Sequence, residues 1–157
     1  MAGTFGYELD VTKLSEEEKA KVRQQISRFK EYYDLIQHGE YYRLLAPTDR
    51  QCTAWEMAES AGKEALVSAV YHHVEGNAAP VIVKVQGLKA EANYQMRLNM
   101  DGLEDMPEEA KEWFMKCLPY GYKEGETISG AALQQCGLVI PGAMEEYQAW
   151  QIHIVEA

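Results

Sequence analysis

Residues 3–18 read Gly-Thr-Phe-Gly-Tyr-Glu-Leu-Asp-Val-Thr-Lys-Leu-Ser-Glu-Glu-Glu, a strand-like run that leads directly into a capped helix. Ser15 and Glu18 form the Ser-x-x-Glu pattern, in which each side chain accepts a hydrogen bond from a backbone amide near the other residue. We therefore expect a helix to begin near Glu16. No earlier strand is present for this strand to pair with. We therefore expect the sequence to begin inside a larger fold.

The expected helix carries a single apolar stripe that continues to its end at His38 and Gly39. Apolar residues recur there at alternating spacings of four and three, which is the period of an amphipathic helix of about six turns. They are Val22, Ile26, Phe29, Tyr33 and Ile36. A stripe of this length predicts a large apolar partner surface.

After Gly39 the apolar period changes to two, which indicates strands. Alternating runs cover residues 41–44, 53–57, 66–74, 81–85 and 94–98, and Trp150, Ile152 and Ile154 alternate with polar residues at the C-terminus. The runs up to residue 98 predict an antiparallel meander. We expect a mainly β fold, an antiparallel β-sandwich preceded by one long α-helix.

The part between the last two groups of strands has a different pattern. Residues 107–118 begin with Pro-Glu-Glu and predict a short amphipathic helix. Gly121, Gly125 and Gly130 predict a loop before a short strand at residues 138–141.

Composition limits the function. The formal charge of −10 at pH 7 comes without any Lys/Arg cluster that could neutralise phosphates, so nucleic acid and membrane surfaces are not expected partners. No stretch has the length and apolarity of a membrane helix or of a targeting segment. The three cysteines are odd in number and widely spaced, which favours a reducing, cytoplasmic location over a disulfide framework or a zinc site.

The run Gly-x-x-Gly-Tyr-Glu-Leu-Asp-x-x-Lys-Leu, with Tyr32-Tyr33-Asp34-Leu35-Ile36-Gln37-His38-Gly39 and Tyr42-Arg43-Leu44-Leu45 after it, closely resembles the C-terminal stretch of family 36 glycoside hydrolases, the bacterial α-galactosidases. Downstream, residues 129–138 resemble the family's Ser-Gly-x-x-Leu-Met-Asn-x-Gly-Leu stretch, with Gln134-Gln135 in place of Met-Asn. The segment from about residue 104 to 126 is longer than expected of relatives.

The resemblance implies a division of the chain and a place for the chemistry. Family proteins have a β-supersandwich, a (β/α)8 barrel with the active site, and a C-terminal antiparallel β domain. Residues 1–39 would then be the last barrel strand and helix, and residues 40–157 the C-terminal domain. The family's nucleophilic and acid/base aspartates belong to upstream barrel segments, and neither of their motifs occurs in this sequence.

The residues themselves offer few catalytic candidates. Glu8 and Asp10 would share one face of an extended segment about 7 Å apart, but we expect them to be ordinary polar residues and assign no catalytic, substrate-binding or metal residue. Adjacent His72 and His73 point to opposite faces of a strand, which disfavours a shared metal. No cofactor is expected, because Gly3-x-x-Gly6 lacks the lysine and third glycine of nucleotide-binding loops.

Aromatic and cysteine side chains are expected mainly in the core. Trp55 and Trp150 lie in phase with apolar strand positions and should be buried, whereas Trp113 lies on an irregular segment. Core packing is the expected role of Cys52, Cys117 and Cys136.

Three functions remain open. The first is a non-catalytic C-terminal part of a retaining α-galactosidase, whose β domain stabilises the barrel or an oligomer; its expected partners are the remainder of the parent chain and a second copy in a homo-oligomer. The second is a carbohydrate-binding β-sandwich module that uses exposed aromatics. The third is a structural or assembly domain.

Overall fold

The computed structural model describes residues 6–48, 51–74, 81–99, 106–143 and 146–157. Residues 3–5 of the opening run and residues 104–105 of the long segment lie outside the described residues. The elements are η1 (Val11–Lys13), α1 (Glu16–Glu31), α2 (Tyr33–His38), β1 (Glu40–Leu45), β2 (Cys52–Ala58), β3 (Glu64–Tyr71), β4 (Val81–Val83), β5 (Asn93–Asn99), α3 (Glu108–Cys117), β6 (Ile128–Ser129), α4 (Gly130–Gln135), β7 (Leu138–Ile140) and β8 (Ala149–Glu156). Residues 6–10 are not assigned to a strand.

The N-terminal helix begins as the capping pattern predicts. The Ser15 hydroxyl accepts from the Glu18 amide at 3.2 Å, and the Glu18 carboxylate accepts from the Ser15 amide at 2.7 Å. The helix does not continue unbroken to His38, as the stripe had predicted. Tyr32, with φ −99° and ψ 11°, separates α1 from α2, because burying its ring against the sheet redirects the chain there.

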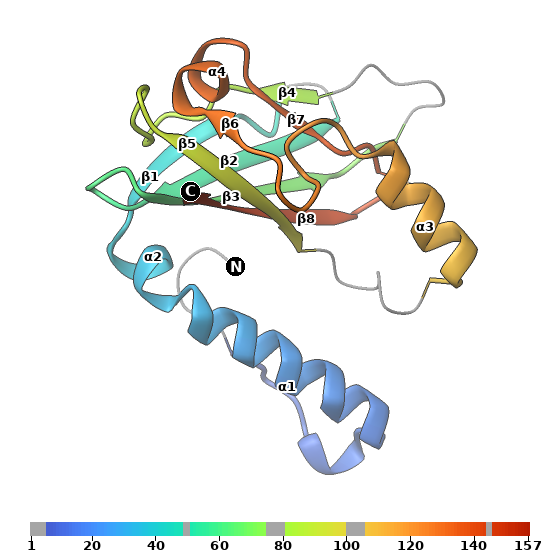
Figure 1. Ribbon diagram of the computed structural model, residues 1–157. Helices are drawn as coiled ribbons and strands as arrows, with labels where there is room; N and C mark the ends of the chain where they lie inside the picture. The colour runs from blue at the N-terminus through green and yellow to red at the C-terminus, as the bar shows by residue number, and fades with distance from the viewer. Residues whose placement is uncertain (1–5, 49–50, 75–80, 100–105, 144–145) are drawn as a thin grey trace.

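The main sheet is antiparallel, with the strand order β1-β2-β3-β8-β5-β6 among the described residues. Among the described residues, only β1, β2 and β3 form a meander, so the prediction of a meander through residue 98 is wrong. β4 leaves this sheet and pairs with β7, and the C-terminal strand β8 takes the place between β3 and β5. Figure 1 shows the sheet with β4, β7 and α4 above it.

The core lies between the main sheet and the second layer of β4, β7 and α4. Trp150, Ile152 and Ile154 of β8 are 0% exposed and pack in one cluster with Leu133 and Leu138 of the second layer. The fold prediction, a mainly antiparallel β-sandwich preceded by a long helix, is confirmed. We call the face of the main sheet toward this core its inner face, and the face toward α2 its outer face.

Two short elements differ from the expected loop at residues 119–137. The Ser129 hydroxyl accepts from the Ala132 amide at 3.2 Å and caps α4, which directly follows β6. The first residue of this helix, Gly130, must be glycine, because a β-carbon there would lie 1.9 Å from the Lys89 carbonyl oxygen. The helix at residues 107–118 and the strand at residues 138–141 are found as α3 and β7.

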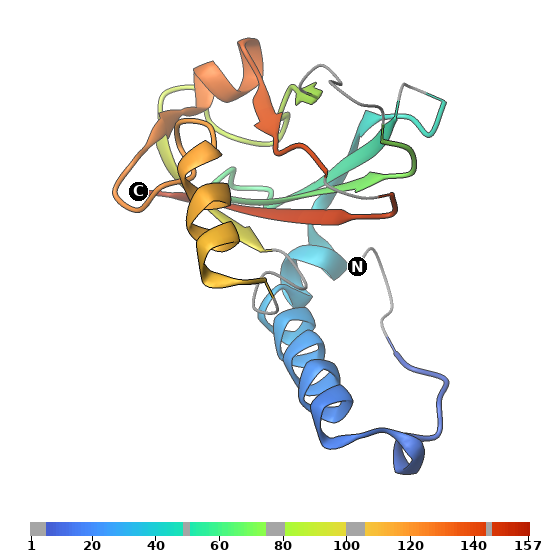
Figure 2. The ribbon, with the colours of Figure 1, turned by 90° about the vertical axis from the view of Figure 1, so that its right-hand side faces the viewer.

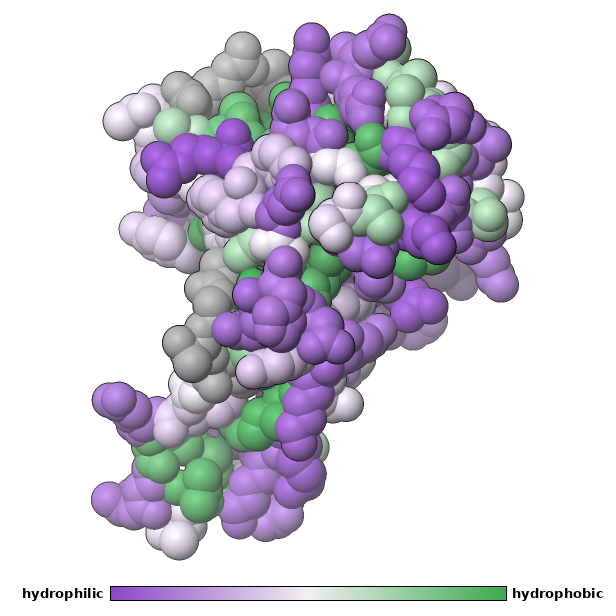
Figure 3. All heavy atoms as spheres, turned by 90° about the vertical axis from the view of Figure 1, so that its left-hand side faces the viewer, coloured by the Kyte–Doolittle hydropathy of each residue, from purple (hydrophilic) through white to green (hydrophobic). Residues whose placement is uncertain are grey.

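α1 projects away from the sheet, and the segment that precedes it lies alongside α1 (Figures 1 and 2). None of its 16 residues is buried, and its stripe residues Val22 and Ile26 are only half-buried. Leu9 and Val11 of the preceding segment are 43% and 56% exposed. Figure 3 shows hydrophobic atoms on this projecting part.

Candidate functional site: the outer face of the sheet

A row of mainly polar residues crosses the outer face of the main sheet from β1 to β5. Directly paired residues on antiparallel strands point to the same side of a sheet. The register pairs each member with the next, so all five share the outer face. We call this set the polar row; it consists of Arg43, Trp55, Ser68, Gln151 and Asn99.

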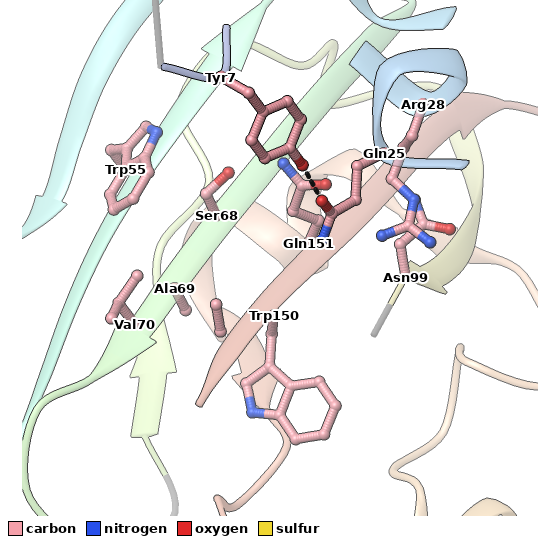
Figure 4. A pocket seen from close by; sticks show the side chains of 11 residues that line it. Tyr7, Gln25, Arg28, Trp55, Ser68, Ala69, Val70, Asn99, Trp150 and Gln151 are labelled. Atoms are coloured by element: carbon pink, nitrogen blue, oxygen red, sulfur yellow. Dashed lines mark hydrogen bonds between the residues drawn. The ribbon is translucent and has the colours of Figure 1, made fainter. Parts of the chain in front are cut away.

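A cavity of about 340 Å³ lies over the polar row. The row supplies its floor with Trp55, Ser68, Gln151 and Asn99, and the N-terminal segment and α1 supply Tyr7, Gln25 and Arg28. The Tyr7 hydroxyl donates to the Gln25 side-chain oxygen across one side of this space (Figure 4). Among the described residues that line it, Arg28 is the one charged side chain, and the others are aromatic, aliphatic or neutral and polar.

Two polar atoms of the polar row have no hydrogen-bond partner within the described part of the chain. They are the Ser68 hydroxyl oxygen and the Trp55 indole nitrogen, and both are shielded from solvent. Ser68 as a residue is 3% exposed. A buried polar group without a partner costs about 1–3 kcal/mol, so these two atoms mark where a hydrogen-bonding partner is needed.

Tyr32 and α2 cover the part of the outer face around Leu66, next to the polar row. Tyr32, Leu35 and Ile36 pack there against Leu66 of β3. Tyr32 also accepts a hydrogen bond from the Asn99 amide at 2.8 Å and lies with its ring centroid 4.9 Å from that of His153. The α1–α2 junction is therefore fixed to the middle of the outer face.

Glu8 and Asp10 are both exposed in the segment before α1. One Asp10 carboxylate oxygen accepts from the Thr12 hydroxyl at 2.6 Å and from the Thr12 amide at 3.0 Å. These bonds hold the pKa of Asp10 below its usual value and cap η1. Asp10 thus has a structural role, and the absence of catalytic residues from this chain stays a prediction.

The tryptophans separate into three environments. Trp150 is 0% exposed, as predicted, and stacks on Phe114 of α3 with ring centroids 5.5 Å apart. Trp113 is 65% exposed. Trp55 is half-buried on the outer face, so the prediction that it belongs to the core is wrong, because Cys52, Ala54, Glu56 and Ala58 are the residues of β2 that face the core.

The histidines do not converge on a common ligand. His73 faces Glu146, with the Nδ1 and Oε1 atoms 2.9 Å apart. The Nε2 atom of His72 is buried without a partner among the described residues. Over the same residues, no group of three or more His, Cys, Asp or Glu side chains is arranged to hold a metal ion.

Core packing describes only one of the cysteines. Cys52 is buried in β2, whereas Cys117 and Cys136 are exposed, and all three are free thiols. The prediction of a core role is therefore wrong for Cys117 and Cys136. Cys117 is the last residue of α3 and Cys136 directly follows α4, and both are exposed at these helix ends.

Glu56 is a buried carboxyl group that the sequence pattern does not single out. It is 0% exposed and accepts from the backbone amides of Gln86 at 2.8 Å and Gly87 at 3.1 Å. Burial raises the pKa of Glu56, and the two amides oppose that shift. Glu56 lies between Trp55 and Met57 on β2. The alternation of polar and apolar residues in the sequence therefore puts it on the face expected to be exposed to solvent.

Comparison with known proteins agrees with this architecture. The Glycosyl hydrolase family 36 C-terminal domain matches residues 52–154, and Melibiase matches residues 1–39. The bifunctional alpha-galactosidase/sucrose kinase AgaSK of Mediterraneibacter gnavus is 38% identical over 156 residues, which are 99% of this chain and 14% of that protein. The structure of its galactosidase domain matches with a TM-score of 0.75 at 35% identity, over 98% of this chain and 18% of that one.

A second relative gives the same result. Alpha-galactosidase AgaA of Geobacillus stearothermophilus is 38% identical over 96 residues, 61% of this chain and 13% of that protein. A crystal structure of an AgaA variant in complex with raffinose has a TM-score of 0.75 at 25% identity, over 98% of this chain and 18% of that one. The chain therefore spans 14% and 13% of the length of these two curated relatives.

The antiparallel β domain and these matches define the class as the C-terminal β domain of a glycoside hydrolase. The chain belongs to the glycosyl hydrolase family 36 C-terminal domain family and corresponds to the C-terminal part of the α-galactosidases of that family. Within the described residues, none of the helices has the length and apolar composition needed to cross a membrane.

Proposed function

We propose that this chain is the C-terminal part of an α-galactosidase whose catalytic carboxylates lie upstream, and that its β domain stabilises the catalytic barrel. The observation that carries the proposal is α1, a helix held by its C-terminal end on the β domain with its apolar stripe only half-buried. In this proposal residues 1–39 belong to the barrel and residues 40–157 to the supporting domain. The stripe packs on the rest of the barrel.

The direction of the chain supports a non-catalytic role for the β domain. If residues 3–10 are the last barrel strand, its carboxyl end is at Asp10, next to η1 and the N-terminal end of α1. Figure 2 shows that this end is the one away from the sheet. Barrel enzymes carry their chemistry at the carboxyl ends of the strands. The helix α1, which has 16 residues, is about 24 Å long and separates that end from the sheet. The sheet therefore lies about that far from the catalytic face.

The substrates in this proposal are terminal α-galactosides of the raffinose or melibiose type. Retaining hydrolysis needs two carboxyl groups about 5–5.5 Å apart that flank the scissile bond. On this account both come from the upstream barrel. The proposed location is the cytoplasm, and the proposed partners are the remainder of the parent chain and other copies of the enzyme.

A chimera tests the proposal. This chain replaces the matching segment of the M. gnavus α-galactosidase, and hydrolysis of an aryl α-galactoside is measured. We expect the chimera to hydrolyse the substrate at a rate within about tenfold of the unmodified enzyme, because the supporting surface is kept and the chemistry lies outside it.

A second chimera is the matched control. It carries the corresponding segment of G. stearothermophilus AgaA, which has the same fold at a similar TM-score. If the AgaA chimera is active and the chimera with this chain folds but is inactive, the supporting role is contradicted.

A further inference from the structure

We draw no further inference here: the strongest candidate, the cavity between α1 and the outer face of the main sheet with the buried, unpartnered polar atoms of Trp55 and Ser68 beside it, carries none, because nothing in the described part of the chain shows what fills it.

Discussion

The side-chain amide of Asn99 donates a hydrogen bond to the Tyr32 hydroxyl at 2.8 Å, across 67 positions of the sequence. Tyr32 lies between α1 and α2, and Asn99 is the last residue of β5. Glu31, next to Tyr32, and Arg97, two residues before Asn99, bring charged atoms to 3.9 Å from each other. Tyr32 therefore ties the α1–α2 junction to β5, and the packing of Leu35 and Ile36 on Leu66 holds the same junction on the sheet.

The first prediction concerns this junction. Tyr32→Phe removes the hydrogen bond to Asn99 and keeps the buried ring, so the free energy of unfolding should fall by about 1 kcal/mol. Tyr33 is 47% exposed, and Tyr33→Phe should change it by less than about 0.5 kcal/mol. Urea denaturation of both variants checks this, and equal effects of the two substitutions would show that Tyr32 does not fix the junction.

The second prediction concerns the pH dependence contributed by Glu56. Burial raises its pKa in the folded state above the ordinary value of 4.5. As the pH rises from 4, the unfolded state loses this proton first, so the contribution of Glu56 to stability is present below pH 4.5 and is lost through its folded pKa. Glu56→Gln carries no titrating group, so the wild type should lose stability relative to this variant as the pH rises.

Urea denaturation of wild type and Glu56→Gln between pH 4 and pH 8 measures this difference. Glu91→Gln, at an exposed residue, is the control and should follow the wild type at every pH. A difference between wild type and Glu56→Gln that is constant with pH, or that changes in the opposite direction, would contradict the assignment.

The third prediction concerns the loop that Glu56 holds. A β-carbon added at Gly87 would lie 2.1 Å from the β-carbon of Ala58, which is 1% exposed in β2. Gly87→Ala should therefore destabilise the domain by about 1–3 kcal/mol or more through overpacking. At Gly142 a β-carbon meets no atom within 4 Å, so Gly142→Ala should have an effect below about 1 kcal/mol. Thermal denaturation of the two variants would refute the close contact if their midpoints shifted equally.

The fourth prediction concerns the thiols. Burial raises the pKa of Cys52 to about 11, and a protonated buried thiol reacts slowly. Ellman's reagent should therefore react with two thiols of the native chain, Cys117 and Cys136, and with the third only in urea. Cys117→Ser and Cys136→Ser should each remove one fast-reacting thiol. Three fast thiols in the folded wild type would contradict the burial of Cys52.

Local signals predicted local structure well. The hydrogen bonds between Ser15 and Glu18 that start α1 involve only residues three positions apart, so the sequence was sufficient to predict where the helix begins. Ser129 followed by Gly-Ala-Ala-Leu-Gln-Gln is a comparable signal for α4, but Gly130 was interpreted as a loop residue. Its need for glycine comes from Lys89, which is distant in sequence.

Long-range pairing could not be predicted in the same way. Val81 and Val83 alternate in the same manner whether β4 joins the main sheet or pairs with β7. On β2, Thr53, Trp55 and Met57 are bulkier than Cys52, Ala54 and Ala58, so hydrophobicity favoured the wrong face. Glu56 can face the core because the amides of Gln86 and Gly87 satisfy it from 30 residues away. The candidate site followed from that choice of face and could not be predicted.

In the proposed function, the catalytic carboxylates lie upstream of these 157 residues. The most direct measurement is the hydrolysis of an aryl α-galactoside by the isolated 157-residue chain at high protein concentration. We expect no turnover above a buffer blank, for the wild type and for Glu8→Gln and Asp10→Asn alike. Turnover by the wild type that either substitution abolishes would contradict it.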